Sequence, residues 1–261
     1  SIEPIYLIVP PWTGVIGILV PTEERQRYFA RMSYMVTLIA LTAQLVVGGL
    51  LYWARQQQEP ARAVSWAGWI FGISFLVAGL TRLNSFRILR RVYCPPLEAG
   101  AESTFTFWQF IRRVRESNFV RFILFVAMVH FAANIFGPYC LPYFRYHLHY
   151  GEWEWILLGV SASAAVVVTL IFWGRFSERF GNRRTLVYTS YVIAVVPLVW
   201  LVTDNYYLFL LGNVVGGFAW GGFGLATWNY ILEAVSAPKR PRCVAYFSVL
   251  TGGAIFLGSM L

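Results

Sequence analysis

Apolar residues fill this chain in long continuous runs, which short charged gaps separate. Eight such runs can be read along the sequence, and most approach the roughly 20 residues that a helix needs to cross a bilayer. Continuous runs predict helices rather than the alternating strands of a membrane barrel. Helices also satisfy their own backbone hydrogen bonds in lipid. The predicted helices span residues 2–20, 32–53, 64–86, 118–141, 154–173, 185–202, 206–232 and 243–261, of which the first and last read as incomplete.

The basic residues predict how these helices are oriented. The gaps between successive predicted helices can be numbered in order along the chain. Of the 21 Lys and Arg residues, 18 lie in the odd-numbered gaps, and only Arg55, Arg62 and Arg145 lie in the even-numbered gaps. Cytoplasmic loops of membrane proteins carry an excess of Lys and Arg. The pattern therefore predicts an integral membrane protein with its basic loops in the cytoplasm, and we expect a bacterial inner membrane.

Composition agrees with a lipid environment and limits the other partners. The chain is 58% hydrophobic and 13% charged, whereas soluble domains carry about 25% charged residues. Its net charge of +9 comes from the gaps and not from one basic face, as in nucleic-acid binders. We therefore expect membrane lipid and no nucleic acid as a partner. The three cysteines are far apart and lack metal-ligand spacing, so neither a metal nor a cofactor is expected.

Two basic gaps form a short internal repeat. The segments "PTEERQRYFAR", from Pro21, and "APKRPRCVAYF", from Ala237, each place a proline before Arg-x-Arg and an apolar helix after it. This alignment pairs Arg25 with Arg240, and Arg27 with Arg242. Parallel repeats of helical bundles are typical of transporters whose halves rock about a central site.

The gap "GRFSERFGNRRTL" contains more than basic residues. Glycines stand at both sides of a glutamate, which the positive-inside rule alone does not explain. The segment resembles the loop motif of the major facilitator superfamily, with Phe176 in place of the usual Leu and Glu178 in place of the usual Asp. The matching positions are Gly174, Glu178, Arg179, Gly181, Arg183 and Arg184. In such a loop a carboxylate can pair with Arg or with a helix N-terminus, and the resemblance implies a clamp that closes the cytoplasmic side.

The resemblance implies a twelve-helix transporter fold, of which this chain holds about eight helices. "LVPTEERQRYFAR" is similar to the loop between the fourth and fifth helices of that family, so the sequence would run from the end of helix four into helix eleven. Residues 1–86 would then belong to the N-terminal bundle, 87–117 to the central cytoplasmic loop, and 118–261 to the C-terminal bundle. Both ends of the chain are expected to be truncated.

The family resemblance also implies that helices 118–141 and 206–232 line a central cavity. Polar residues inside membrane helices usually face the bundle interior. The candidate cavity residues are His130, Asn134, Asn213 and Trp220, with Gln44 on helix 32–53. Each amide can instead bond to a neighbouring helix, and the glycines near Trp220 can serve close packing alone. His130 is the candidate carrier of a coupled proton.

We interpret the sequence as a secondary transporter that moves an unidentified small solute by alternating access, driven by an ion gradient. The alternative is a non-transporting membrane protein of the same fold, such as an assembly factor or a pigment- or lipid-associated factor. No P-loop, HExxH or GxSxG motif occurs, so an enzyme is not expected.

Overall fold

The computed structural model describes residues 25–57, 60–91, 106–236 and 239–261, and every element within them is a helix. The long helices are α2 (Arg25–Arg55), α3 (Pro60–Leu89), α5 (Asn118–Pro142), α6 (Glu152–Phe180), α7 (Asn182–Val195), α9 (Tyr206–Ala234) and α10 (Arg240–Met260). Shorter pieces are α4 (Phe107–Arg112), η2 (Arg113–Arg115), η3 (Tyr143–His147), η4 (Val196–Leu198) and α8 (Val199–Val202).

Seven of the described helical segments are long and apolar enough to span a membrane. They coincide with the predicted runs from 32–53 to 243–261, which confirms a polytopic helical membrane bundle. The predicted run 2–20 lies outside the described residues. Two of these spans are composite: Asn118–His147 combines α5 with η3, and Asn182–Val202 combines α7 and α8 with η4, which contains Pro197.

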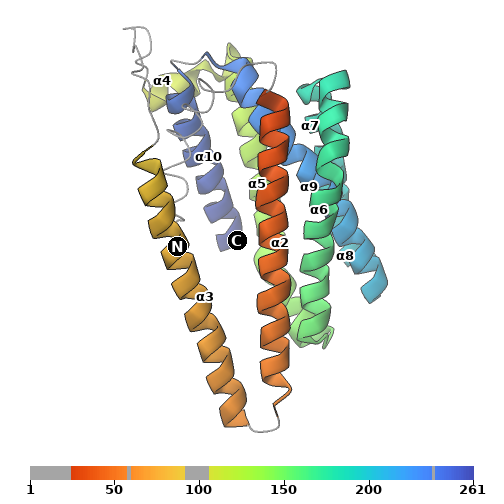
Figure 1. Ribbon diagram of the computed structural model, residues 1–261. Coiled ribbons are helices and arrows are strands. Elements are labelled where there is room, and N and C mark those ends of the chain that lie inside the picture. Colours follow the sequence, from red (N-terminus) through yellow and green to blue (C-terminus); the bar gives the residue numbers. More distant parts are fainter. Residues whose placement is uncertain (1–24, 58–59, 92–105, 237–238) are drawn as a thin grey trace.

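The helices stand side by side with their connections at two ends (Figure 1). The start of α2, the short α4 and the start of α10 lie at the upper end of this view, and the end of α2 and the start of α3 lie at the lower end. Within the bundle, α9 packs against α6 and α7, α10 packs against α5, and α2 packs against α3 and α6. The contact of α2 with α6 joins the predicted N-terminal and C-terminal halves.

The largest buried cluster lies where α5, α9 and α10 meet. Its fully buried members include Ile123 and Val126 of α5, Phe223 and Ile231 of α9, and Val244 of α10. The backbones of α5 and α9 make few close contacts, and aromatic side chains fill the space between them. The rings of Phe122 and Tyr230, for example, lie 4.3 Å apart.

The outer surfaces of the bundle are apolar. Side chains such as Phe75 of α3 (75% exposed) and Leu201 of α8 (84% exposed) point away from the protein. Soluble monomers rarely expose large contiguous apolar patches, so these surfaces fit hydrocarbon rather than water. The structure thereby supports the lipid environment that the composition predicted.

Candidate functional site

Two of the sequence-predicted cavity residues meet near the middle of the membrane spans. His130 is the thirteenth of 30 residues in its span, and Trp220 is the fifteenth of 29. Their ring centroids are 5.4 Å apart, and both rings also contact Phe223. His130 and Trp220 are each half-buried. The fold therefore places an imidazole and an indole together on the seam between α5 and α9.

Asn134 lies one helical turn beyond His130, at a bend-prone part of α5. Its Nδ2 donates a hydrogen bond of 2.8 Å to the carbonyl of His130, and its Cβ faces Gly258 of α10. Pro138 follows four residues later within the same helix. Because proline has no N–H, the carbonyl of Asn134 lacks its usual helical hydrogen bond. This turn therefore holds two oxygens of Asn134, one of the side chain and one of the main chain, that can accept hydrogen bonds.

Asn213 lies two turns from Trp220 on α9 and is not brought to His130. Its Nδ2 donates to the carbonyl of Phe209 in its own helix, at 2.9 Å. Gly217, which lies between Asn213 and Trp220, packs directly on the backbone of Ala162 in α6. Gly217 therefore serves close packing of α9 against α6.

Gln44 takes part in a polar contact between helices. Its Oε1 accepts a hydrogen bond of 3.3 Å from Ser163 of α6, and its Nε2 lies against Gly159. One turn along α2, Gly48 packs on Ile156. The structure therefore places Gln44 in a cross-helix hydrogen bond between α2 and α6.

The motif segment is mostly helical. The sequence indicated a gap from residue 174, but α6 continues to Phe180 and α7 begins at Asn182, so only Gly181 separates the two helices. Gly181 has φ +86° and ψ 153°, a region open almost exclusively to glycine. Gly174, by contrast, lies within α6, and a Cβ there would meet nothing within 4 Å.

A buried polar cluster at this junction was missed by the sequence analysis. Ser177 donates to Oδ1 of Asn182, and Nδ2 of Asn182 donates to Oε1 of Glu233 at 2.8 Å. Ser177 and Asn182 are 3% and 4% exposed, so both are effectively removed from solvent. The cluster ties the α6–α7 junction to the end of α9. A possible signal was Glu233 itself, because it closes a 27-residue stretch of α9 without any other charge.

The four charged motif residues lie on the surface. Glu178, Arg179, Arg183 and Arg184 are all exposed, and the guanidinium of Arg179 lies 5.3 Å from the ring centroid of Phe180. The carboxylate that bonds within the junction is therefore that of Glu233. Glu178 stands on the outside of the last turn of α6.

The repeat arginines begin equivalent helices. Arg25 is the first residue of α2 and Arg240 is the first residue of α10, although the side chains of Arg25 and Arg27 lie outside what the structure describes. The Arg240 side chain is buried, and its Nη2 donates to the carbonyls of Leu232 and Val235 at 3.0 and 3.1 Å. Arg240 thus caps the carboxyl end of α9, while Arg242 is exposed.

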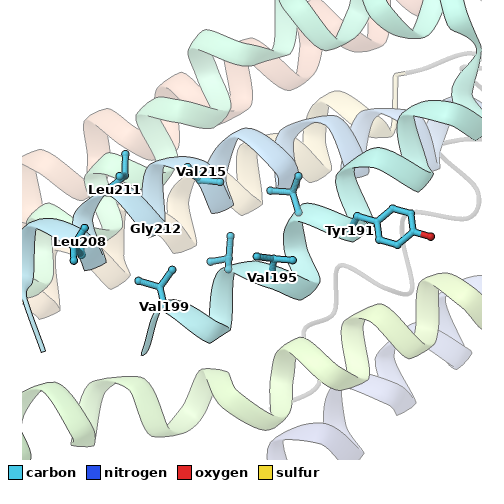
Figure 2. Close-up of a pocket in the computed structure, with 9 residues that line it drawn as sticks. Tyr191, Val195, Val199, Leu208, Leu211, Gly212 and Val215 are labelled. Carbon is cyan, nitrogen blue, oxygen red and sulfur yellow. The ribbon is translucent and has the colours of Figure 1, made fainter. Parts of the chain in front are cut away.

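A separate cavity of about 370 Å³ lies between α7, η4 and α9 (Figure 2). It is lined by Val192, Val195, Val196, Val199, Leu208, Leu211, Gly212, Val215 and Tyr191. The hydroxyl of Tyr191 points away from the other lining residues, so the lining is apolar. An almost entirely apolar wall cannot orient a polar solute, so the α5–α9 seam is the better candidate for solute binding.

Comparisons with known proteins agree with the architecture. The family model described as Major Facilitator Superfamily matches residues 7–259, nearly the whole chain. The protein named "Putative transporter svop-1" of Caenorhabditis elegans is 25% identical over 101 residues. That match covers 38% of this chain and 19% of the relative, so the two share only part of their lengths. No solved structure matches.

Proposed function

Because this chain belongs to the Major Facilitator Superfamily, a family of membrane transporters, we propose that it moves a small solute by alternating access. The observation that carries this proposal is the family match over residues 7–259. The polar and aromatic seam within the proposed C-terminal half supports it, since it lies near the middle of the membrane spans, the depth at which transporter sites lie. Residues 1–86 and 118–261 would form parts of the two rocking halves, with 87–117 as the cytoplasmic connection.

The contact between α2 and α6 fits such a motion. Gln44 and Ser163 join the two proposed halves through one hydrogen bond between half-buried side chains. Cross-helix hydrogen bonds in membranes contribute about 0.6 kcal/mol on average. A hydrogen bond of that strength can hold the two side chains in register, and it breaks easily when one half tilts against the other.

The proposal is tested with the full-length product of the gene that encodes this sequence, purified and reconstituted into proteoliposomes. Saturable uptake of a solute is expected, with a rate that responds to an imposed ion gradient. Correct insertion without uptake, together with co-purification of a stable membrane partner, would instead favour the assembly-factor alternative. Protease accessibility of the 87–117 segment in inverted vesicles checks the proposed cytoplasmic location of the basic loops in the bacterial inner membrane.

We expect His130 to carry a coupled proton, because its imidazole stands at mid-membrane and titrates near neutral pH in water. His130→Gln keeps a hydrogen-bonding side chain but removes the base. In this variant an imposed pH gradient should no longer accelerate uptake, while exchange without a gradient continues. His147→Gln is the control, since His147 is exposed at the end of the span. Proton-driven uptake at the wild-type rate in His130→Gln would assign coupling elsewhere.

We expect Glu178 to latch the cytoplasmic side, as the motif implies. The exposed carboxylate at the end of α6 can reach a basic side chain or a helix N-terminus of the opposite half. Glu178→Gln should cut uptake strongly and leave membrane insertion intact, as measured by flux and by yield of folded protein. Glu116→Gln, another exposed acidic position, is the matched control. Normal flux in Glu178→Gln would reduce the motif to a determinant of topology.

A further inference from the structure

We propose that the elbow before α5 binds anionic phospholipids of the adjoining leaflet on its exposed face. The elbow comprises α4, η2 and the first turn of α5, residues 106–121. This inference goes beyond the proposed transport function, because it concerns the lipid partner of a surface and not the path of the solute. Three observations carry it: an inner face that packs on the bundle, an outer face with one indole and two guanidinium groups, and a backbone held at both ends.

The inner face of the elbow is apolar and packs against the bundle. Phe110 is 5% exposed and belongs to the main buried cluster, against which Ile111 and Val114 also pack. The ring of Tyr246 in α10 lies 5.2 Å from the ring of Phe110 and 5.4 Å from the ring of Phe107. Because this face is covered by protein, the opposite face of the elbow must point away from the bundle.

The contact with Tyr246 indicates the depth of α4 in the membrane. Tyr246 is the seventh residue of α10, which is one of the spans, and lies about 9 Å along the helix axis from the first residue. In Figure 1, α4 lies at the upper end of the bundle, near the start of α10. The headgroup region of a bilayer is roughly 5–8 Å thick on each side. The elbow therefore lies close to the level of the lipid phosphates.

The outer face of the elbow combines an indole with two guanidinium groups. Trp108 is 72% exposed, and Arg112 and Arg115 are exposed as well. Trp108 and Arg112 are four residues apart in α4 and share a face. Residues three apart are eclipsed in a 3₁₀-helix, so Arg115 of η2 follows on the same side. Tryptophan favours the headgroup level of a bilayer, and guanidinium groups bind phosphate through paired hydrogen bonds.

The charge of the elbow is complementary to an anionic headgroup. Residues 106–121 contain four arginines and one acidic residue, Glu116. Each arginine close to an anionic leaflet strengthens binding about fivefold. Arg121 serves the fold instead, because its Nε donates to the carbonyl of Val114 at 2.9 Å and its Nη2 donates to the carbonyl of Arg115. Arg112 and Arg115 are therefore the residues that we assign to the phosphate.

Hydrogen bonds hold the backbone of the elbow at both of its ends. At the start, the backbone N–H of Gln109 donates to the hydroxyl of Thr106 at 3.3 Å, and the backbone N–H of Thr106 donates to Oε1 of Gln109 at 3.0 Å. This reciprocal pair is a capping box, and Arg121 holds the other end. A backbone that is ordered before binding loses less entropy when a lipid binds.

The test measures which lipid surrounds Trp108. The full-length protein is placed in phosphatidylcholine nanodiscs that contain a fixed fraction of brominated phosphatidylglycerol or of brominated phosphatidylcholine. Bromine quenches tryptophan fluorescence on contact, and the difference between wild type and Trp108→Phe isolates the signal of Trp108. We expect the brominated phosphatidylglycerol to quench this signal at least about threefold more strongly. The preference should shrink near 1 M salt, where charges are screened beyond about 3 Å.

Two paired variants decide whether the arginines of the elbow cause this preference. Arg112→Gln with Arg115→Gln should abolish the preference. Arg87→Gln with Arg91→Gln removes the same charge from exposed positions around the end of α3 and should keep it. Melting temperatures near the wild-type value in both pairs show that the fold is preserved.

Three results would overturn the proposal. Equal quenching by both lipids in wild type shows that the elbow does not select anionic lipid. An equal loss of preference in both paired variants reduces the effect to general attraction by a basic protein surface. Protection of Trp108 by poly-L-glutamate without any lipid preference assigns the face to an acidic protein segment. The readout is independent of uptake, so this inference and the proposed transport function fail separately.

Discussion

Gly217→Leu is expected to prevent α9 from packing against α6 and to abolish the recovery of folded protein. A Cβ at Gly217 would lie only 2.9 Å from the carbonyl carbon of Ala162. The obstructing atoms belong to a helix backbone, which cannot rotate away as a flexible side chain can. Overpacking a well-packed interior costs about 1–3 kcal/mol and occasionally more, and this backbone clash should reach at least the upper end. The yield of monodisperse protein in detergent and its melting temperature measure the effect.

Gly224→Leu provides the contrast on the same helix. Both glycines belong to one stripe of α9, but only Gly217 contacts a neighbouring backbone. We expect Gly224→Leu to melt near the wild-type temperature, because a Cβ there meets nothing within 4 Å, whereas Gly217→Leu should fail at folding. A wild-type melting temperature for Gly217→Leu would show that α6 and α9 are not in close contact.

Arg240→Met is expected to destabilise the junction between α9 and α10. The variant keeps much of the apolar volume but removes the donor that serves the carbonyls of Leu232 and Val235. Hydrogen bonds from charged donors contribute about 1.5–3 kcal/mol each, so the loss should approach about 3 kcal/mol at this buried position. A fall of several degrees in melting temperature is the expected readout.

Arg242→Met is the matched control for the cap. Arg242 lies two residues away in the same helical turn region and is exposed, so its replacement should change the melting temperature much less. Arg240→Lys should recover only part of the lost stability, because an ammonium group lacks the fork geometry of guanidinium. Equal effects of Arg240→Met and Arg242→Met would contradict the capping role of Arg240.

The membrane spans followed from the sequence because lipid imposes a strict local rule. A segment that crosses the bilayer must be apolar and about 20 residues long, and this requirement is visible without knowledge of any neighbour. The helix ends were less predictable. Four of the seven residues 174–180 are charged or polar, yet the segment continues α6 beyond its apolar stretch. A helix requires backbone hydrogen bonds rather than apolar side chains, so its end need not coincide with the edge of the hydrophobic run.

The candidate site was predictable only in part. His130 and Trp220 could be singled out as unusual residues within apolar helices, but their contact depends on how α5 and α9 pack. The hydrogen bond of Gln44 depends on the position of Ser163 in α6, which the sequence of α2 does not specify. Asn182 and Glu233 are 51 residues apart and bond only because α7 and α9 meet at one end of the bundle.

The sequence by itself determined the helical membrane architecture and the resemblance of 174–184 to the family motif. Both depend on local properties, namely the length of the apolar runs and the positions of charges and glycines. Tertiary structure alone decided that Arg240 is buried and Arg242 exposed, which carboxylate joins the α6–α7 junction, and which glycine of α9 is packed or open. The physical reason is that burial and hydrogen-bond partners are properties of two or more helices together. In apolar helices of similar composition, no single segment specifies its neighbour.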